Sequence, residues 1–553
     1  MPRWSRSEQA AKRLAGDLPG LSERQQAGHV GVARTTLQYW RQRQAAIQAP
    51  AAEVAFFETA EGIALLHRLL IGAHFVITLL GCGGVRLVCQ FLELTGLATY
   101  IAASYGVQQG VNVALEEAVV HYAEQQRRQL GEGMAPRTIT VCEDETFHPE
   151  ICLVGLEPVS NFILLERYAE NRSAESWTAA LTAALSGLPV QVIQATSDEA
   201  KGLCRHVQTD LGAQHAPDLF HLQHEVAKAT GLPLVRQVKA AEQALADAQA
   251  RLEQPYQART AYESHRPPGR PPAFEQRLAQ AHQQVAVAER DLHHAHAHQT
   301  QAQEVLHELS AAYHPYDLDT AQIQPSGRVA ERLQGCWQTL NQLARAAHLP
   351  ERCQQQIRKA QRLTGSLLAT LSFFFATVQA KIEALNLPLE VETVVYHSLI
   401  PAIYLERVAD KTATADLPQT LRQRAASLIA PLSQPGSALA PLHDEERRLL
   451  EQVATDRADL FQRSSSCVEG RNGQLALHHH ARHRLSDRKL SALTAVHNYF
   501  IQRPEGTTAA QRFFGRPPDK LFEWVLKKTS LPGRPACKRP RPAKPPYLQP
   551  IAA

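Results

Sequence analysis

Paired cysteines are missing from this 553-residue chain. Its nine cysteines are an odd number, and no two of them form a C-x-x-C pair. We therefore expect neither a complete set of disulfides nor a structural zinc cage, and a reducing cytoplasm fits this cysteine usage best. A secretory leader is not indicated either, because the N-terminus reads MPRWSRSEQ and has no apolar core.

A strong net charge is also absent. The formal net charge is +4, with 20% charged and 44% hydrophobic residues, which is typical of a soluble globular chain and excludes a disordered or fibrous one. The basic residues are nevertheless uneven, since arginine gathers near the N-terminus and lysine, arginine and proline near the C-terminus. That asymmetry favours a polyanionic partner.

Uninterrupted membrane-length apolar segments are scarce. The stretch 69–85 is apolar for 17 residues, but His74 lies in its middle, and Arg68 and Arg86 flank it. We predict a buried helix here and no membrane association.

Residues 1–50 are predicted to form a small helical unit. A helix starts after Ser22, a Val-Gly-Val turn follows at 30–32, and the next helix places Leu37 and Trp40 inward. The pattern resembles a helix-turn-helix, whose second helix enters the major groove of DNA. The outward, DNA-binding candidates are Arg34, Thr35, Gln38, Arg41 and Arg43. The alternative is an ordinary helical hairpin with a solvated basic face.

Further along, helical and strand patterns alternate. Residues 51–134 are predicted to be a helical N-terminal domain with no recognisable chemistry. Residues 135–230 read as three strands, a helix, a strand, a helix, a fifth strand over 215–222 and a further helix. This order predicts the first part of an α/β RNase H-like core, a mixed five-stranded sheet with flanking helices.

The remainder is predicted to be mainly helical. Residues 231–460 form a helical insertion, in which apolar residues spaced four and three apart predict an antiparallel coiled-coil hairpin over about 234–310. The sequence SHRPPGRPP separates its two helices, because neither helix could cross it. Residues 461–528 are predicted to complete the core, and 529–553 to form a flexible basic, proline-rich tail.

Acidic residues stand at three places that could meet in the predicted core. TVCEDETFHPE holds three acids in the first strand, Asp198 ends the fourth strand, and Glu469 lies on a late helix. Strand alternation places Glu143 and Glu145 on one face of the first strand and Asp144 on the other, but this alternation does not decide which face matters. Converging carboxylates of this kind suit divalent cations in phosphoryl transfer.

The order of these motifs resembles the DDE-type transposases of bacterial insertion sequences whose RNase H-like core is split by a large helical insertion. The resemblance covers about 140–230 and 460–526. The segments that carry it are DETF, TSDEAKGL, PDLFHLQHEVAKA, CVEGRNGQ and GTTAAQRFFGRPPDKLFEWVL. It implies a metal-binding catalytic triad of Asp144, Asp198 and Glu469.

The resemblance also implies cofactors and partners. Two Mg²⁺ ions, with Mn²⁺ able to substitute, would support cleavage at transposon ends and strand transfer into target DNA. The expected partners are double-stranded DNA and further copies of the chain, as a homodimer or higher oligomer, in a bacterial, nucleoid-associated protein. Candidate residues lining the site are Glu145, Asp218, His221, Arg471 and Asn472.

Two alternatives remain open from the sequence. The chain could be a nuclease of the same fold that cuts DNA without strand transfer, or a non-catalytic DNA-binding protein derived from a transposase. For Asp218 and His221, the alternative to a place in the site is that they orient the turn from strand to helix.

Overall fold

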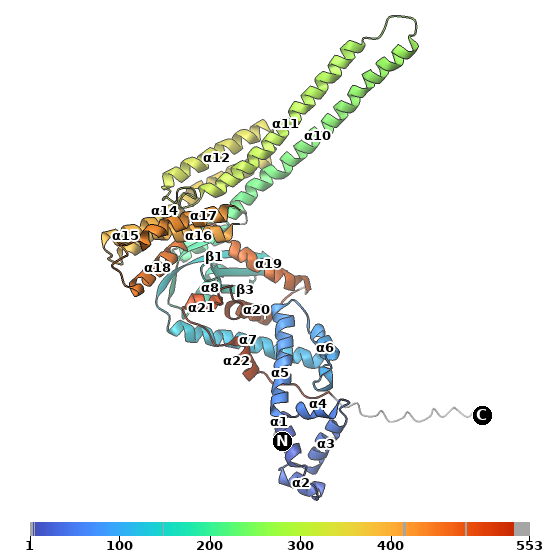
Figure 1. Ribbon diagram of the computed structural model, residues 1–553, viewed down its shortest axis with the longest axis vertical. Coiled ribbons are helices and arrows are strands. Elements are labelled where there is room, and N and C mark those ends of the chain that lie inside the picture. Colours follow the sequence, from blue (N-terminus) through green and yellow to red (C-terminus); the bar gives the residue numbers. More distant parts are fainter. Residues whose placement is uncertain (1–3, 5, 148, 413–415, 482–483, 536–553) are drawn as a thin grey trace, which may run out of the picture.

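The computed structural model describes residue 4 and residues 6–147, 149–412, 416–481 and 484–535. Most of the predicted tail, from residue 536 onward, lies outside this part of the chain. The structure combines one mixed sheet with many helices, and a long helical hairpin projects from one end (Figure 1).

Five strands form one sheet in the order β3-β2-β1-β4-β5. Their bounds are β1 Arg137–Phe147, β2 Ile151–Glu157, β3 Phe162–Ala169, β4 Val190–Ser197 and β5 Gln214–Pro217. The first three strands are antiparallel neighbours, whereas β4 pairs in parallel with both β1 and β5. The mixed five-stranded sheet with flanking helices was thus predictable from the sequence, although β5 ends before Asp218 rather than reaching residue 222.

Helices from both ends of the chain share one hydrophobic core with this sheet. They are α4 Ala51–Phe56, α5 Ala60–His74, α6 Val85–Leu94, α7 Tyr105–Glu132, α19 Ser466–Ala481, α20 Asp487–Tyr499, α21 Ala509–Phe514 and α22 Leu521–Lys528. Tyr122 of α7 packs edge-to-face on Tyr499 of α20, and Phe162 of β3 stacks on Phe513 of α21 with ring centroids 4.5 Å apart. The segment predicted as a separate domain at 51–134 is therefore packed into the same core as the sheet.

The apolar stretch predicted as a buried helix at 69–85 is buried on one face only. Helix α5 continues into a π-helical turn at Phe75–Leu80, and the chain breaks before α6 starts at Val85. Leu66 and Leu70 are fully buried, whereas Leu69 and Val76 on the other face are exposed. Among the described residues, Ala60–Leu80 and Glu351–Glu383 are long and apolar enough to cross a membrane, and both belong to partly buried helices.

The remaining helices of the sheet region and the N-terminal unit are short. Helix α8 spans Ala174–Leu185 and α9 Lys201–Arg205, while α1 Arg6–Ala15, α2 Glu23–His29 and α3 Arg34–Ala45 form the N-terminal unit around Ala27, Leu37 and Trp40. Ser22 is the N-cap of α2, as its position before the first helical turn predicted.

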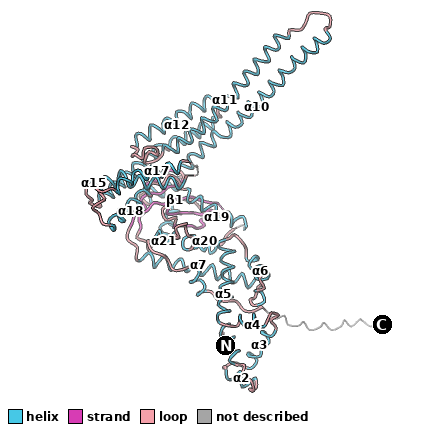
Figure 2. The backbone as a smooth tube through the Cα atoms, viewed as in Figure 1, coloured by secondary structure: helices cyan, strands magenta, loops and turns pink. Residues whose placement is uncertain are grey.

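The insertion is built from helices around a second hydrophobic core. These are α10 Leu219–His265, α11 Phe274–Ala312, α12 Ser326–Ala346, α13 Glu351–Arg362, α14 Thr364–Glu383, α15 Leu389–Val394, α16 Ile400–Lys411, α17 Leu417–Ile429 and α18 Asp444–Ala458. Helices α10 and α11 run side by side as the projecting hairpin (Figure 2), joined by the proline-rich loop. The predicted boundary at residue 231 falls inside α10, because Pro233 is accommodated within this helix instead of ending it.

The Asp218 carboxylate joins the two ends of the insertion. One of its oxygens accepts hydrogen bonds from the backbone N–H groups of Phe220 and His221, so that Asp218 caps α10. The other oxygen accepts from the backbone N–H of Ser465 at 3.0 Å and from the Ser465 hydroxyl. Leu219 N–H also donates to the carbonyl oxygen of Arg463 at 2.9 Å. The chain therefore leaves the sheet and returns to it at one clamped point.

We expect the substitution Asp218→Ala to lower the free energy of unfolding by about 2–4 kcal/mol. It removes a helix cap and leaves the buried donors of Ser465 unsatisfied. Urea denaturation would measure the change. A matched control is Asp416→Ala, because Asp416 precedes α17 without any side-chain cap bond and is exposed. Equal losses in the two variants would contradict the clamp.

Candidate functional site

Two of the predicted acids are brought together by strand register. Cys142 of β1 pairs with Thr196 of the parallel neighbour β4. Continuing both strands by two residues reaches Asp144 and Asp198, and a step of two keeps each side chain on the same face as before. The first carboxylate lies in the central strand and the second at the C-terminal end of the adjacent one. Both acids therefore lie toward the C-terminal ends of two neighbouring parallel strands, β1 and β4.

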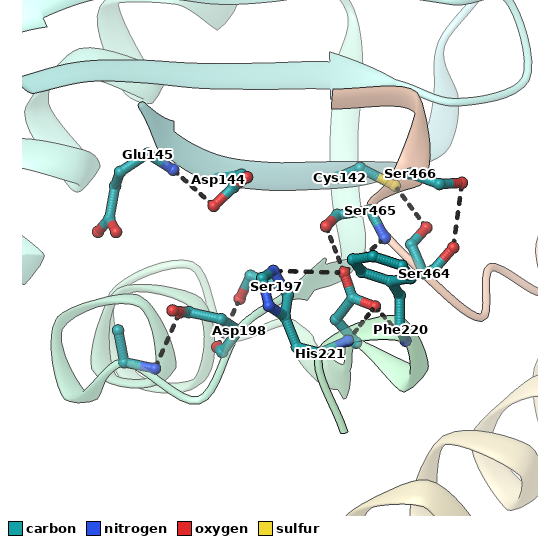
Figure 3. A network of polar contacts seen from close by, with 12 residues as sticks. Cys142, Asp144, Glu145, Ser197, Asp198, Phe220, His221, Ser464, Ser465 and Ser466 are labelled. Carbon is teal, nitrogen blue, oxygen red and sulfur yellow. Dashed lines mark hydrogen bonds and ion pairs between the residues drawn. The ribbon is translucent and has the colours of Figure 1, made fainter. Parts of the chain in front are cut away.

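A third acid and a histidine arrive from helices. Ligand atoms of Asp144, His221 and Glu469 all lie within 4.8 Å of one another. His221 lies in the first turn of α10, directly after the Asp218 clamp, and Glu469 lies in the first turn of α19, four residues after Ser465. Figure 3 shows Asp144 above His221, with Asp198 turned toward the adjoining helix and away from Ser464–Ser466.

Asp198 stands at the margin of this group. Its Oδ1 accepts a hydrogen bond from the backbone N–H of Ala200 at 2.9 Å, which turns the side chain toward the start of α9. Its charge still reaches the first strand, because it contributes to raising the pKa of both Asp144 and Glu145. The arrangement therefore consists of three convergent groups with Asp198 as a close neighbour.

The environment of Asp144 disfavours the charged form of its carboxyl group. Burial raises its pKa to about 7, and the charges of Asp198 and Glu469 add to the rise. The backbone N–H of Glu145, which donates to Asp144 Oδ1 at 2.8 Å, and the nearby His221 oppose the shift. A nearby cation would lower the pKa of Asp144, because it would favour the charged form of the carboxyl.

The opposite face of β1 carries a different set of contacts. Glu143 is fully buried, and its Oε1 lies 3.4 Å from Nε2 of the equally buried His206. Glu145 contacts the indole N–H of Trp177 and the guanidinium of Arg172, each at 3.4 Å. Burial, with Asp198 next, raises the pKa of Glu145. Of the three acids in the motif, only Asp144 meets the late glutamate.

Arg471 holds α19 in place. It does not line the cavity that lies next to the site, between the sheet and the insertion. Its guanidinium makes a buried, two-pronged ion pair with Glu166 of β3, at 2.8 and 2.7 Å. Burial alone would raise the pKa of Glu166, but Arg471 outweighs it and lowers this pKa below its usual value. Asn472 does not line that cavity either, and its buried side-chain oxygen has no hydrogen-bond donor among the described residues.

A cavity of about 320 Å³ opens next to the site, between the sheet and the insertion. Asp198, Asp218 and His221 line one side, while Gln356 and Lys359 of α13 line another, and Arg172 adds a second positive charge. The sequence did not predict that Gln356 and Lys359 line this cavity. Nothing in the local pattern of α13 indicates that this helix packs near acids that lie so far away in the chain.

The N-terminal unit presents part of the predicted outward face. Arg34 and Thr35 are exposed, and Gln38 bonds to Glu23. Arg41 is only partly exposed, and its guanidinium donates to Gln26 Oε1 at 2.8 Å and to the carbonyl of Gly16 at 2.9 Å. Arg43 contacts the carbonyl oxygens of Arg534 and Pro535, so it ties α3 to the C-terminal segment.

Comparison with protein families gives a partial match. A family model described as a family of unknown function, DUF6399, matches residues 395–541. The match runs from the last helices of the insertion through α19, with Glu469, and into the C-terminal helices that complete the core. No curated protein and no solved structure matches the chain.

The raised pKa of Asp144 predicts a pH-dependent stability in metal-free buffer. The folded pKa of about 7 exceeds the unfolded value of about 3.9, so the folded state binds more protons between these values and loses stability as pH rises. Asp144→Asn removes this loss. Because Asp144 is partly exposed and screened by water, we expect the variant to be about 2 kcal/mol more stable than the parent at pH 8.

At pH 4 the two proteins should have nearly equal stability, because the carboxyl is then protonated in the folded state and about half protonated in the unfolded one. Urea denaturation with a chelator present would measure both points. A difference that does not change with pH would mean that the substitution acts through packing and not through charge.

Proposed function

We propose that the chain is a DDE-type transposase with an RNase H-like core. The observation that carries the proposal is the convergence of Asp144, His221 and Glu469 from a strand and two helices, with Asp198 at the end of the next strand. A group of acids assembled from distant segments, in which burial raises the pKa of Asp144 and the neighbouring acids add to the rise, suits metal-dependent phosphoryl transfer.

The sheet supports the proposal in a second way. The strand order β3-β2-β1-β4-β5, with antiparallel pairing among the first three strands and parallel pairing beyond, is the layout expected for such a core. It puts β1 in the centre and β4 beside it, which are the strands that deliver the first two acids. The helical insertion between β5 and α19 then accounts for the long interval before Glu469.

The donors fit Mg²⁺, with Mn²⁺ as a substitute. Carboxylate oxygens are the protein ligands that Mg²⁺ prefers, and one imidazole is compatible with Mn²⁺. Asp144, Asp198 and Glu469 would hold the ions, and a bound cation would favour the charged form of the Asp144 carboxyl. Two bound divalent ions would supply the positive charge that activates the attacking oxygen and stabilises the leaving 3′ oxygen.

The protein's own groups would mainly position DNA. Arg172 and Lys359 face the cavity and would bind phosphates flanking the scissile bond. Water would attack the phosphorus at the element end and release a 3′-hydroxyl, which would then attack a phosphodiester of the target. The exposed part of α3 would bind terminal-repeat DNA, and holding two element ends together would require a homodimer or larger assembly.

The direct test is a cleavage and joining assay with full-length protein and Mg²⁺. The DNA would carry the inverted repeats expected beside the gene. We expect Asp144→Asn, Asp198→Asn and Glu469→Gln each to lower the rate at least about 100-fold, since each removes part of the charge stabilisation of the transition state. Asp247→Asn on the projecting hairpin is the control and should retain the parental rate.

Parental rates in the three triad variants would overturn the proposal. Cleavage by the parent without joined 3′-hydroxyl products would replace it with a nuclease of the same fold. Absence of both reactions and of Mg²⁺ binding would favour a non-catalytic DNA-binding protein.

Within α3, we expect Arg34 to contact DNA and Arg41 to have a structural role. Arg34→Ala should weaken binding to repeat DNA and reduce the salt dependence of log K by about one unit, because an exposed cation is lost. Arg41→Ala should instead destabilise the N-terminal unit by about 1–3 kcal/mol, through the loss of its bonds to Gln26 and Gly16. Fluorescence anisotropy and thermal melting would measure the two effects. Unchanged DNA affinity in Arg34→Ala would contradict the role of α3.

A further inference from the structure

Three chemically different side chains that can bind a metal gather next to the Asp198 turn. Glu199 follows β4, Cys204 lies in α9, and His215 lies in β5. Their ligand atoms all lie within 4.8 Å of one another. Cys204 Sγ is 3.8 Å from Glu199 Oε2 and 3.9 Å from His215 Nε2.

These separations are close to the edges of a tetrahedral zinc site. Bond lengths of about 2.3 Å for Zn–S and about 2.0–2.1 Å for Zn–N place the sulfur and nitrogen about 3.6 Å apart at a tetrahedral angle. The observed distance from Cys204 to His215 exceeds this by only a few tenths of an ångström. Glu199 is exposed, so its side chain is free to complete the approach.

The donor set selects a different ion from the one that suits the carboxylate group. A thiolate, an imidazole and a carboxylate together favour Zn²⁺, whereas Mg²⁺ prefers oxygen ligands alone. Burial also suits a metal site, because His215 is buried, Cys204 is half-buried, and Glu199 opens to solvent. Three protein ligands with one side open leave a fourth position for water.

We propose that Glu199, Cys204 and His215 form a zinc-binding site that is separate from the Asp144 group. On binding, the Cys204 thiol releases its proton to solvent and the sulfur bonds to the ion. His215 Nε2, now 3.0 Å from the Ser197 hydroxyl, gives its lone pair to the ion, with the ring proton on Nδ1. The ion links the end of β4, α9 and β5, and thereby fixes the turn that carries Asp198.

Cobalt provides a probe for this site, because a Co²⁺–thiolate bond has a near-ultraviolet charge-transfer absorption that oxygen ligands do not give. Reduced, chelator-treated full-length protein is titrated with Co²⁺. We expect the band to saturate at one equivalent and to disappear when Zn²⁺ is added. Cys204→Ser should abolish it, and Glu199→Gln should weaken Co²⁺ binding by at least about tenfold.

Two variants serve as controls. Cys89→Ser removes another partly buried cysteine, on α6, and should keep the band. Asp144→Asn disables the carboxylate group and should also keep it, so this test does not depend on the proposed catalytic function. No thiolate band in the parent, a band that persists in Cys204→Ser, or loss of the band in Asp144→Asn would each overturn the separate zinc site.

Discussion

The hydrogen bonds between Asp218 and Ser465 are the constraint on which the candidate site depends. They join residues 247 positions apart, at the point where the chain leaves the sheet and the point where it returns. His221 follows three residues after the first point, and Glu469 four residues after the second. The clamp therefore helps to place both side chains relative to Asp144. The buried carboxylate of Asp218 therefore holds together the two ends of the long helical insertion.

An ion pair adds a second constraint on α19. The clamp sets where the helix begins, and the buried pair of Arg471 and Glu166 attaches its next turn to β3. Both oxygens of Asp218 accept hydrogen bonds, and Glu166 is paired with a guanidinium. Asp144 has no guanidinium partner among the described residues, and burial raises its pKa. The same region thus contains two acids that stabilise the fold and one acid whose charged form burial disfavours, which is the contrast expected of a metal-binding group.

The sequence predicted the parts of the molecule that follow local rules. Runs of β-forming residues located the strands, and the apolar spacing located the α10–α11 hairpin. Strand alternation separated Asp144 from Glu143 and Glu145. It did not predict tertiary choices. Asp218 and Arg471 have the same residue types as a catalytic or DNA-binding group, and only their partners reveal a positioning role. Three further features likewise depend on packing between segments that are apart in the sequence. They are the hydrogen bonds of Arg41 to Gln26 and Gly16, the position of α13 beside the cavity, and the proximity of Glu199, Cys204 and His215.

The central claim is that Asp144, Asp198 and Glu469 share divalent cations. A crystal structure of the protein soaked in Mn²⁺, analysed by anomalous scattering, tests this most directly. The account predicts anomalous density bound to Asp144 together with Glu469 or Asp198, at carboxylate distances of about 2.0–2.3 Å. Density only at other sites, or no density between these carboxylates at saturating Mn²⁺, would contradict it.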